Sequence, residues 1–96
     1  MGHRRPRPEH LGRKLRQIRL AFGLSQDLIR TRLGFPHIHP GRISEYETGT
    51  RVPPPDILLA YADLAGVHVE DLINDKLHLP EKLPGNVHHG VLPRNT

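Results

Sequence analysis

Apolar residues recur at helical spacing in several short segments of this chain, and the first segment shows the pattern most clearly. Within residues 9–22, one position in every three or four is apolar: Leu11, Leu15, Ile18 and Phe22. This spacing places the apolar side chains on one face of an α-helix. Basic residues fill the other faces of that helix: Arg13, Lys14, Arg16 and Arg19. Gly23 follows at a position where a left-handed glycine commonly ends a helix, so we expect a first helix over residues 9–22.

Capping residues mark a second helix directly after this glycine. Ser25 is a natural N-cap because its hydroxyl can accept a backbone N–H of the first turn. Leu24 and Ile29 have the spacing of a hydrophobic staple across that cap. Gly34 would end the helix after about two turns. The apolar side of this second helix is expected to comprise three residues: Leu28, Ile29 and Leu33.

A third helix is delayed by two prolines. Pro36 and Pro40 each disfavour helical geometry in the residue before them, so residues 35–39 are expected to form a loop. Pro40 itself suits the first helical position, where a missing N–H costs nothing. We therefore predict a helix from Pro40 to Thr48, with His39 as its N-cap and Gly49 as its stop. Its inward residues would be Ile43 and Tyr46.

Two more helices complete an all-α domain over residues 9–75. The fourth is expected over residues 55–65 before Gly66, with an apolar side drawn from Leu58, Leu59, Ala62 and Ala65. The fifth is expected over residues 69–75, contributing Leu72 and Ile73. Residues 1–8 are expected to form a flexible basic arm, and residues 76–96 a tail rich in proline and histidine. Three leucines of this tail could fold back and pack against the domain: Leu77, Leu79 and Leu83.

Composition narrows the classes of protein that remain. A chain of 96 residues can bury one modest core, and without cysteine it has no disulfide, no thiol catalysis and no zinc site of the cysteine type. No apolar run approaches the roughly 20 residues that span a bilayer. The basic N-terminus lacks the apolar stretch of a signal peptide. We therefore expect a soluble cytoplasmic protein without a membrane partner.

The charge is unevenly distributed along the chain. Residues 1–51 hold 11 Lys/Arg and 4 Asp/Glu, net +7, whereas residues 52–96 hold 3 Lys/Arg and 6 Asp/Glu, net −3, in agreement with +4 for the whole chain. Such a basic half is typical of a surface that meets a polyanion, although a solubilising charge pattern is the alternative. In the arm, Arg4, Arg5 and Arg7 could follow a DNA minor groove or simply keep the chain soluble.

The second and third helices carry a family resemblance. Two short helices joined by a turn make a helix-turn-helix, whose second helix enters the DNA major groove. The stretches Gly23-Leu24-Ser25-Gln26 and Ile43-Ser44-x-Tyr46-Glu47-x-Gly49-x-Arg51-x-Pro53 resemble the Cro/C1-type (XRE) helix-turn-helix family, and the match extends over residues 11–73. The resemblance implies a compact five-helix, lambda-repressor-like domain that binds specific DNA sequences and often forms a homodimer.

The resemblance also implies roles for individual residues. Gln26 matches a glutamine that binds a DNA phosphate. Three residues match the segment after the third helix that contacts the DNA backbone: Thr48, Thr50 and Arg51. The positions that read base edges correspond to three residues: Pro40, Gly41 and Glu45. Ser44 faces the same side. Arg19 and Glu47 match a structural salt bridge between the first and third helices.

Two features depart from the family pattern. Gly34 precedes Ile43 by nine residues, so the turn is three residues longer than usual, and Arg30 stands where the family prefers a small residue. Because Pro40 and Gly41 offer no side-chain hydrogen bonds, direct readout passes to four other residues: His39, Arg42, Ser44 and Glu45. Arg30 is a further candidate for backbone contact. For each, a solvated surface residue is the alternative, and Glu45 could instead pair with a local arginine.

Histidine-based and catalytic chemistry find little support. His37 and His39 lie in the loop and His88 and His89 in the tail, without a third ligand at fixed spacing, so no metal site is expected. No phosphate-binding glycine loop, nucleophile elbow or paired carboxylates indicate an enzyme or a cofactor. Two hypotheses follow: a small DNA-binding transcriptional regulator, with repression as its expected mode, or an antitoxin-like adaptor that binds a protein partner through the same fold.

Overall fold

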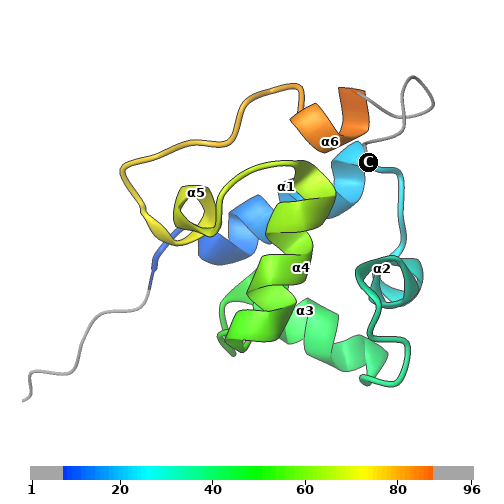
Figure 1. The fold of residues 1–96 in the computed structure, drawn as a ribbon. Coiled ribbons are helices and arrows are strands. Elements are labelled where there is room, and N and C mark those ends of the chain that lie inside the picture. Colours follow the sequence, from blue (N-terminus) through cyan, green and yellow to red (C-terminus); the bar gives the residue numbers. More distant parts are fainter. Residues whose placement is uncertain (1–7, 88–96) are drawn as a thin grey trace, which may run out of the picture.

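The computed structural model describes residues 8–87, and within them every regular element is a helix (Figure 1). The elements are α1 (Leu11–Ala21), α2 (Gln26–Leu33), α3 (Pro40–Thr48), α4 (Pro55–Ala65), α5 (Val69–Ile73) and α6 (Pro84–Val87). The five expected helices are confirmed, and a single turn, α6, is added. Residues 1–7 of the basic arm and the pair His88 and His89 lie outside the described residues.

The helix ends follow the capping chemistry of the sequence. The hydroxyl of Ser25 accepts the N–H of Leu28 at 3.0 Å, which makes it the N-cap of α2. Gly34 ends that helix with φ of 91°, a left-handed conformation that side chains rarely adopt. His39 ranks poorly as a cap, yet its Nδ1 accepts the N–H of Gly41 at 2.9 Å. The imidazole therefore satisfies one of the free donors at the start of α3.

The core lies where α1 and α4 meet the other helices. Helix α1 packs against α3, α4 and α5, while α4 also contacts α2, α5 and α6. The largest fully buried side chains come from α1 to α5 and from the residue directly before α6: Leu15, Ile18, Ile29, Ile43, Tyr61, Leu72 and Leu83. Gly12 allows α1 to approach α3 closely, because a Cβ at this position would lie 2.5 Å from the backbone oxygen of Glu47. Any side chain there would push α1 away from α3.

Three leucine and isoleucine residues expected in the core are instead exposed. Leu28, Leu59 and Ile73 are exposed by 54%, 53% and 42%, so these predictions were wrong. The reason in α4 is a shift of the buried stripe, which runs through Ile57, Leu58, Tyr61, Ala62 and Ala65 and leaves Leu59 on the opposite side. In α2, the buried residues are Ile29 and Leu33, and Leu28 lies outside the face that they form.

Lys14 was expected on a polar face but is only 5% exposed. Its Nζ donates to the backbone oxygens of Asp71 at 2.8 Å and of Asn74 at 3.0 Å, at the C-terminal end of α5. These carbonyls have no partner within a helix, and a cation near a helix C-terminus is favourable. Burial lowers the pKa of Lys14, and the nearby carboxylates of Asp75 and Asp71 oppose that shift.

A carboxylate completes the same junction from the other side. Asp75 accepts the backbone N–H groups of Glu9 at 2.8 Å and His10 at 3.0 Å, immediately before α1. These two hydrogen bonds hold the pKa of Asp75 below its usual value. Lys14 and Asp75 therefore fasten the start of α1 to the end of α5, although the two segments lie far apart in the sequence.

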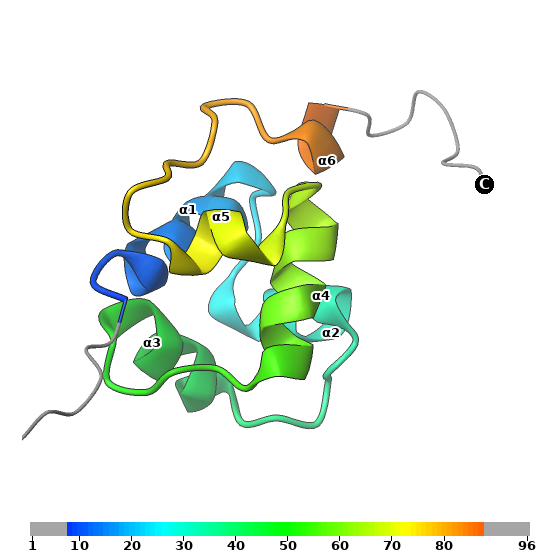
Figure 2. The same cartoon turned by 60° about the vertical axis from the view of Figure 1, so that its left-hand side comes forward.

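The segment after α5 returns to the domain. Leu83 is 1% exposed and belongs to the core, and Leu79 packs against the core as a partly buried residue. In both views, the segment leading to α6 and α6 itself lie at the end of the molecule opposite α3 (Figure 2). Among the helices of residues 8–87, none has the length and apolar character needed to cross a lipid bilayer.

Replacing Lys14 with Met keeps an apolar stem but removes both hydrogen bonds to α5. We expect the free energy of unfolding of the Lys14→Met variant to fall by about 1–3 kcal/mol, because two carbonyls at the end of α5 lose a charged donor. Urea denaturation followed by circular dichroism measures the change. The exposed Lys82→Met is the control and is expected to stay within about 0.5 kcal/mol of the natural protein. Equal effects of the two substitutions would contradict the role given to Lys14.

Candidate nucleic-acid interface

One carboxylate joins the three helices that build the candidate interface. Glu47, near the end of α3, receives Nε of Arg19 on Oε2 at 2.7 Å and Nη2 on Oε1 at 3.0 Å. The amide of Gln26, the first residue of α2, donates to the same Oε1 at 3.2 Å. Arg19 also donates Nη1 to the backbone oxygen of Leu24 at 3.0 Å. The positions of α1, α2 and α3 are therefore coupled through a single side chain.

This network lies largely out of solvent. The side chains of Arg19 and Glu47 are exposed by 11% and 4%, and the hydrogen bond to Glu47 raises the pKa of Arg19 above its ordinary value. Tyr61 in α4 is fully buried nearby, and its pKa is raised by burial and further by the charge of Glu47. Charge-assisted, bidentate pairs of this kind have a defined geometry, so the pair orients α3 as well as holding it.

The two faces of α3 differ sharply. Ile43 and Tyr46 are exposed by 0% and 4% and form the inner face. The opposite face is open to solvent to varying degrees: Pro40, Gly41 and Thr48 are exposed, whereas Arg42, Ser44 and Glu45 are half-buried. His39 at the leading end is also exposed. The beginning of α3 is therefore uncovered, as a helix that enters a groove must be.

A charged cluster occupies the outer face of α3. Glu45 accepts Nε of Arg51 on Oε1 at 2.9 Å, and Nε of Arg42 lies 3.8 Å from the same oxygen. Next to this cluster, the hydroxyl of Thr48 donates to the backbone oxygen of Glu45 at 3.3 Å and lies 3.0 Å from the hydroxyl of Thr50. In the free protein, Glu45 therefore pairs with the local arginines.

Arg30 is directed to the turn between α2 and α3 rather than to the outer face. Its Nη1 donates to the backbone oxygen of Pro36 and, at 2.7 Å, to that of Ile38, while Nη2 pairs with Asp27. Only 15% of the Arg30 side chain is exposed. The longer turn and the arginine in mid-helix therefore form one feature, since the guanidinium supplies donors to carbonyls of the extra turn. Arg30 could bind a DNA phosphate only by giving up its hydrogen bonds to Pro36, Ile38 and Asp27.

The arrangement of α2, the turn and α3 is that of a helix-turn-helix, and a comparison with protein families agrees. A family model described as a helix-turn-helix domain matches residues 10–74. The chain belongs to this helix-turn-helix family. Neither the curated proteins nor the solved structures contain a match to the chain. In this helix-turn-helix domain, α3 occupies the position of the helix that enters the major groove, and α2 the position of the helix that lies across the backbone.

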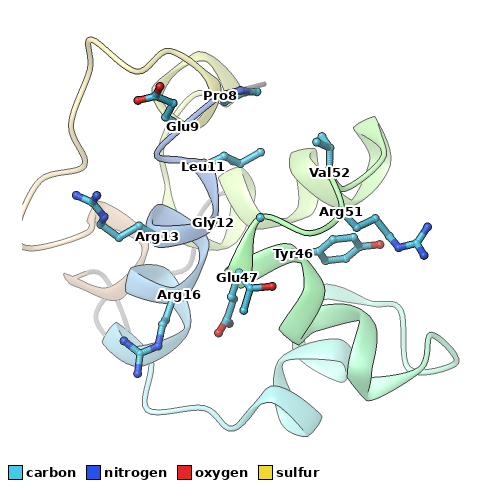
Figure 3. Close-up of a pocket in the computed structure, with 12 residues that line it drawn as sticks. Pro8, Glu9, Leu11, Gly12, Arg13, Arg16, Tyr46, Glu47, Arg51 and Val52 are labelled. Atoms are coloured by element: carbon cyan, nitrogen blue, oxygen red, sulfur yellow. The ribbon is translucent and has the colours of Figure 1, made fainter. Parts of the chain in front are cut away.

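Two arginines of α1 were not singled out from the sequence as site residues. Arg13 and Arg16 are exposed and have no ion-pair or hydrogen-bond partner among residues 8–87. They border an open groove of about 280 Å³ whose opposite wall comes from the end of α3 and from Arg51 and Val52 (Figure 3). In the sequence they resembled solvated residues on a polar face, and only the packing of α1 on α3 brings them beside the interface.

The histidines of the turn do not form a metal centre in the described part of the chain. Within residues 8–87, no group of three or more histidine, cysteine, aspartate or glutamate residues lies close enough to hold a metal ion. His39 has its Nδ1 engaged as the cap of α3, and the ring of His37 lies 6.4 Å from that of Phe35, centroid to centroid. In the free protein, His39 therefore contributes to the start of α3.

The helix-turn-helix offers a matched pair of arginines for testing the turn. We expect Arg30→Met to lower the free energy of unfolding by about 1–3 kcal/mol and to speed amide exchange in residues 38–42, because two carbonyls of the turn lose their donor. Arg32→Met on the same helix removes an exposed arginine without a partner in residues 8–87, so it is expected to change neither quantity appreciably. Urea denaturation measures the free energy of unfolding, and hydrogen exchange measures the opening of residues 38–42. A similar response of the two variants would refute the role of Arg30 in holding the turn.

Proposed function

We propose that this helix-turn-helix protein binds specific sequences of double-stranded DNA and acts as a small transcriptional repressor. The observation that carries the proposal is the division of α3 into a buried inner face and an uncovered outer face with an exposed leading end. A protein bound at an operator would exclude polymerase by occupying the same DNA. In this view phosphate contacts supply most of the affinity, and α3 supplies register and sequence preference.

Residues divide into two groups by the part of DNA that they would meet. Arg42 is the principal base reader, because a guanidinium pairs with the two acceptors of guanine at about 1–3 kcal/mol of discrimination. Ser44, His39 and the small Gly41 lie on the same part of α3 and would contact adjacent base edges. Phosphate contacts fall to the residues beside α3: Gln26, Thr48, Thr50 and Arg51. Arg30 is not assigned to DNA, since it is engaged with the turn.

The unpaired arginines of α1 support a polyanionic partner. Arg13 and Arg16 keep their charges free of partners among residues 8–87, and they lie on the helix that packs against α3. Cations that a protein leaves unneutralised on one side create a positive potential there, which attracts a phosphate backbone and raises the rate of encounter. The net charge of +7 in residues 1–51 agrees with this interpretation.

The adaptor hypothesis receives less support. An adaptor could bind a protein partner through the leucines of the tail only if these side chains were exposed. Leu83 is 1% exposed within the core of this chain, so that side chain is not available to another protein. We therefore place DNA binding first and keep a protein partner as an outcome to be tested by pull-down.

Selection from a random duplex library tests the proposal directly. We expect enrichment of a defined sequence, and a two-fold symmetric sequence if the protein binds as a homodimer. The logarithm of the affinity is expected to fall linearly with the logarithm of the salt concentration, because phosphate contacts release counterions. Failure to retain any duplex, with recovery of one stoichiometric protein from cell extract, would favour the adaptor instead.

Substitution of Arg42 separates sequence reading from general affinity. Arg42→Ala is expected to reduce discrimination at one base pair by about 1–3 kcal/mol, because the guanine contact is lost. Competition gel shifts against the selected sequence and its single-base variants measure this difference. Lys76→Ala, an exposed residue beyond α5, is the control and should leave the discrimination unchanged. An Arg42→Ala variant that keeps full discrimination would remove Arg42 from the reading residues.

A further inference from the structure

The charged cluster on the outer face of α3 presents a conflict. Glu45 stands at a position that the resemblance assigns to base reading, yet its carboxylate lies between two arginines, 2.9 Å from Nε of Arg51 and 3.8 Å from Nε of Arg42. A carboxylate on this face is repelled by phosphates, whereas both arginines are attracted by them. The carboxylate of Glu45 is therefore the counter-ion of two arginines, Arg42 on α3 and Arg51 directly after it.

The pair of Glu45 with Arg51 is built into the backbone. The N–H of Arg51 donates to the backbone oxygen of Glu45 at 3.2 Å, so the chain after α3 returns to the residue whose side chain it also meets. The hydroxyl of Thr48 donates to the same backbone oxygen at 3.3 Å. These contacts hold Arg51 beside Glu45 in the absence of DNA, which distinguishes the pair from two surface charges that meet by chance.

The pair is nevertheless easy to exchange. The side chains of Arg51, Glu45 and Arg42 are exposed by 51%, 41% and 39%, and ion pairs with such exposure contribute little to stability. A phosphate can therefore replace the carboxylate of Glu45 as the partner of Arg51. After that exchange the carboxylate is left beside DNA without a counter-ion, which is unfavourable unless a base presents a hydrogen-bond donor to it.

From this geometry we infer that Glu45 is a positioning residue that restrains binding to unselected DNA. It neutralises Arg51 and Arg42 in the free protein, so that contact with phosphate costs the loss of an existing pair. On a duplex that presents an amino group in the major groove, such as that of cytosine, the carboxylate of Glu45 gains a new donor, which offsets the loss of its arginine partner. On other duplexes the carboxylate stays without a donor, so specificity arises from a penalty against the wrong sequence. The inference rests on the proposed function.

Glu45→Gln tests the inference because it removes the charge and keeps the shape. We expect the affinity for a random-sequence duplex to rise by about two- to fivefold, the range that an exposed charge pair supports. The salt dependence is expected to become steeper by up to about one unit of log–log slope, because one more cation is free to displace counterions. The affinity for the selected sequence should rise less or fall, so that the ratio of specific to unspecific affinity decreases.

A second variant shows whether Glu45 acts through Arg51. In an Arg51→Gln background, Glu45→Gln is expected to give a much smaller gain on the random duplex, because the principal cation that the carboxylate restrains is absent. Asp63→Asn is the matched control: it removes one negative charge from an exposed residue of α4, near the end that contacts α6, and should leave the affinity and the salt slope unchanged. Circular dichroism confirms that each variant folds.

The outcomes separate the inference from the proposed function. If the natural protein binds a selected sequence but Glu45→Gln binds the random duplex no better, the inference is overturned and the proposed function stands. Weaker binding of both duplexes by Glu45→Gln also overturns it, since Glu45 would then support Arg51 in gripping phosphate. If the natural protein binds no duplex at all, both the inference and the proposed function fail.

Discussion

The buried ion pair between Arg19 and Glu47 is the constraint on which the rest of the molecule depends. Removing two charges from water costs free energy, and the cost is recovered only when the geometry is good and the remaining donors and acceptors are satisfied. Here the pair is bidentate, and Gln26 and the backbone oxygen of Leu24 complete it. Because these residues come from α1, the start of α2 and the end of α3, the ion pair helps to set the arrangement of the helix-turn-helix together with the apolar core.

The longer turn is possible because the sequence supplies its own support. Extra residues between α2 and α3 add backbone carbonyls that need donors, and Arg30 supplies them at Pro36 and Ile38. His39 then caps α3 through its imidazole, so the first turn of α3 is satisfied although the preceding turn is longer than usual. The start of α3 is thus held by His39, and its end by the pair of Glu47 with Arg19. The outer face between them remains open.

Much of the fold could be predicted because the residues that start and stop its helices act locally. Ser25, Gly34, Pro40 and Gly49 act within one turn of helix, so α2 and α3 begin and end where the sequence indicates. Burial is not local, and Leu28 is exposed because the direction of α2 is set by its neighbours. Lys14 did carry a signal, since it lies on the same helical stripe as Leu11, Leu15 and Ile18, but its partners come from α5. Likewise, the sequence left two interpretations of Glu45 open because the turn that returns Arg51 to Glu45 after α3 became visible only in the structure.

A double-mutant cycle on the free energy of unfolding tests most directly whether Arg19 and Glu47 act as one unit. The four proteins are the natural chain, Arg19→Met, Glu47→Met and the double variant, compared by urea denaturation. The account predicts that each single change costs about 3–5 kcal/mol, because it leaves a buried charge unpaired, and that the double variant costs clearly less than the sum. Single costs that simply add, with each below about 1 kcal/mol, would contradict the central role given to this pair.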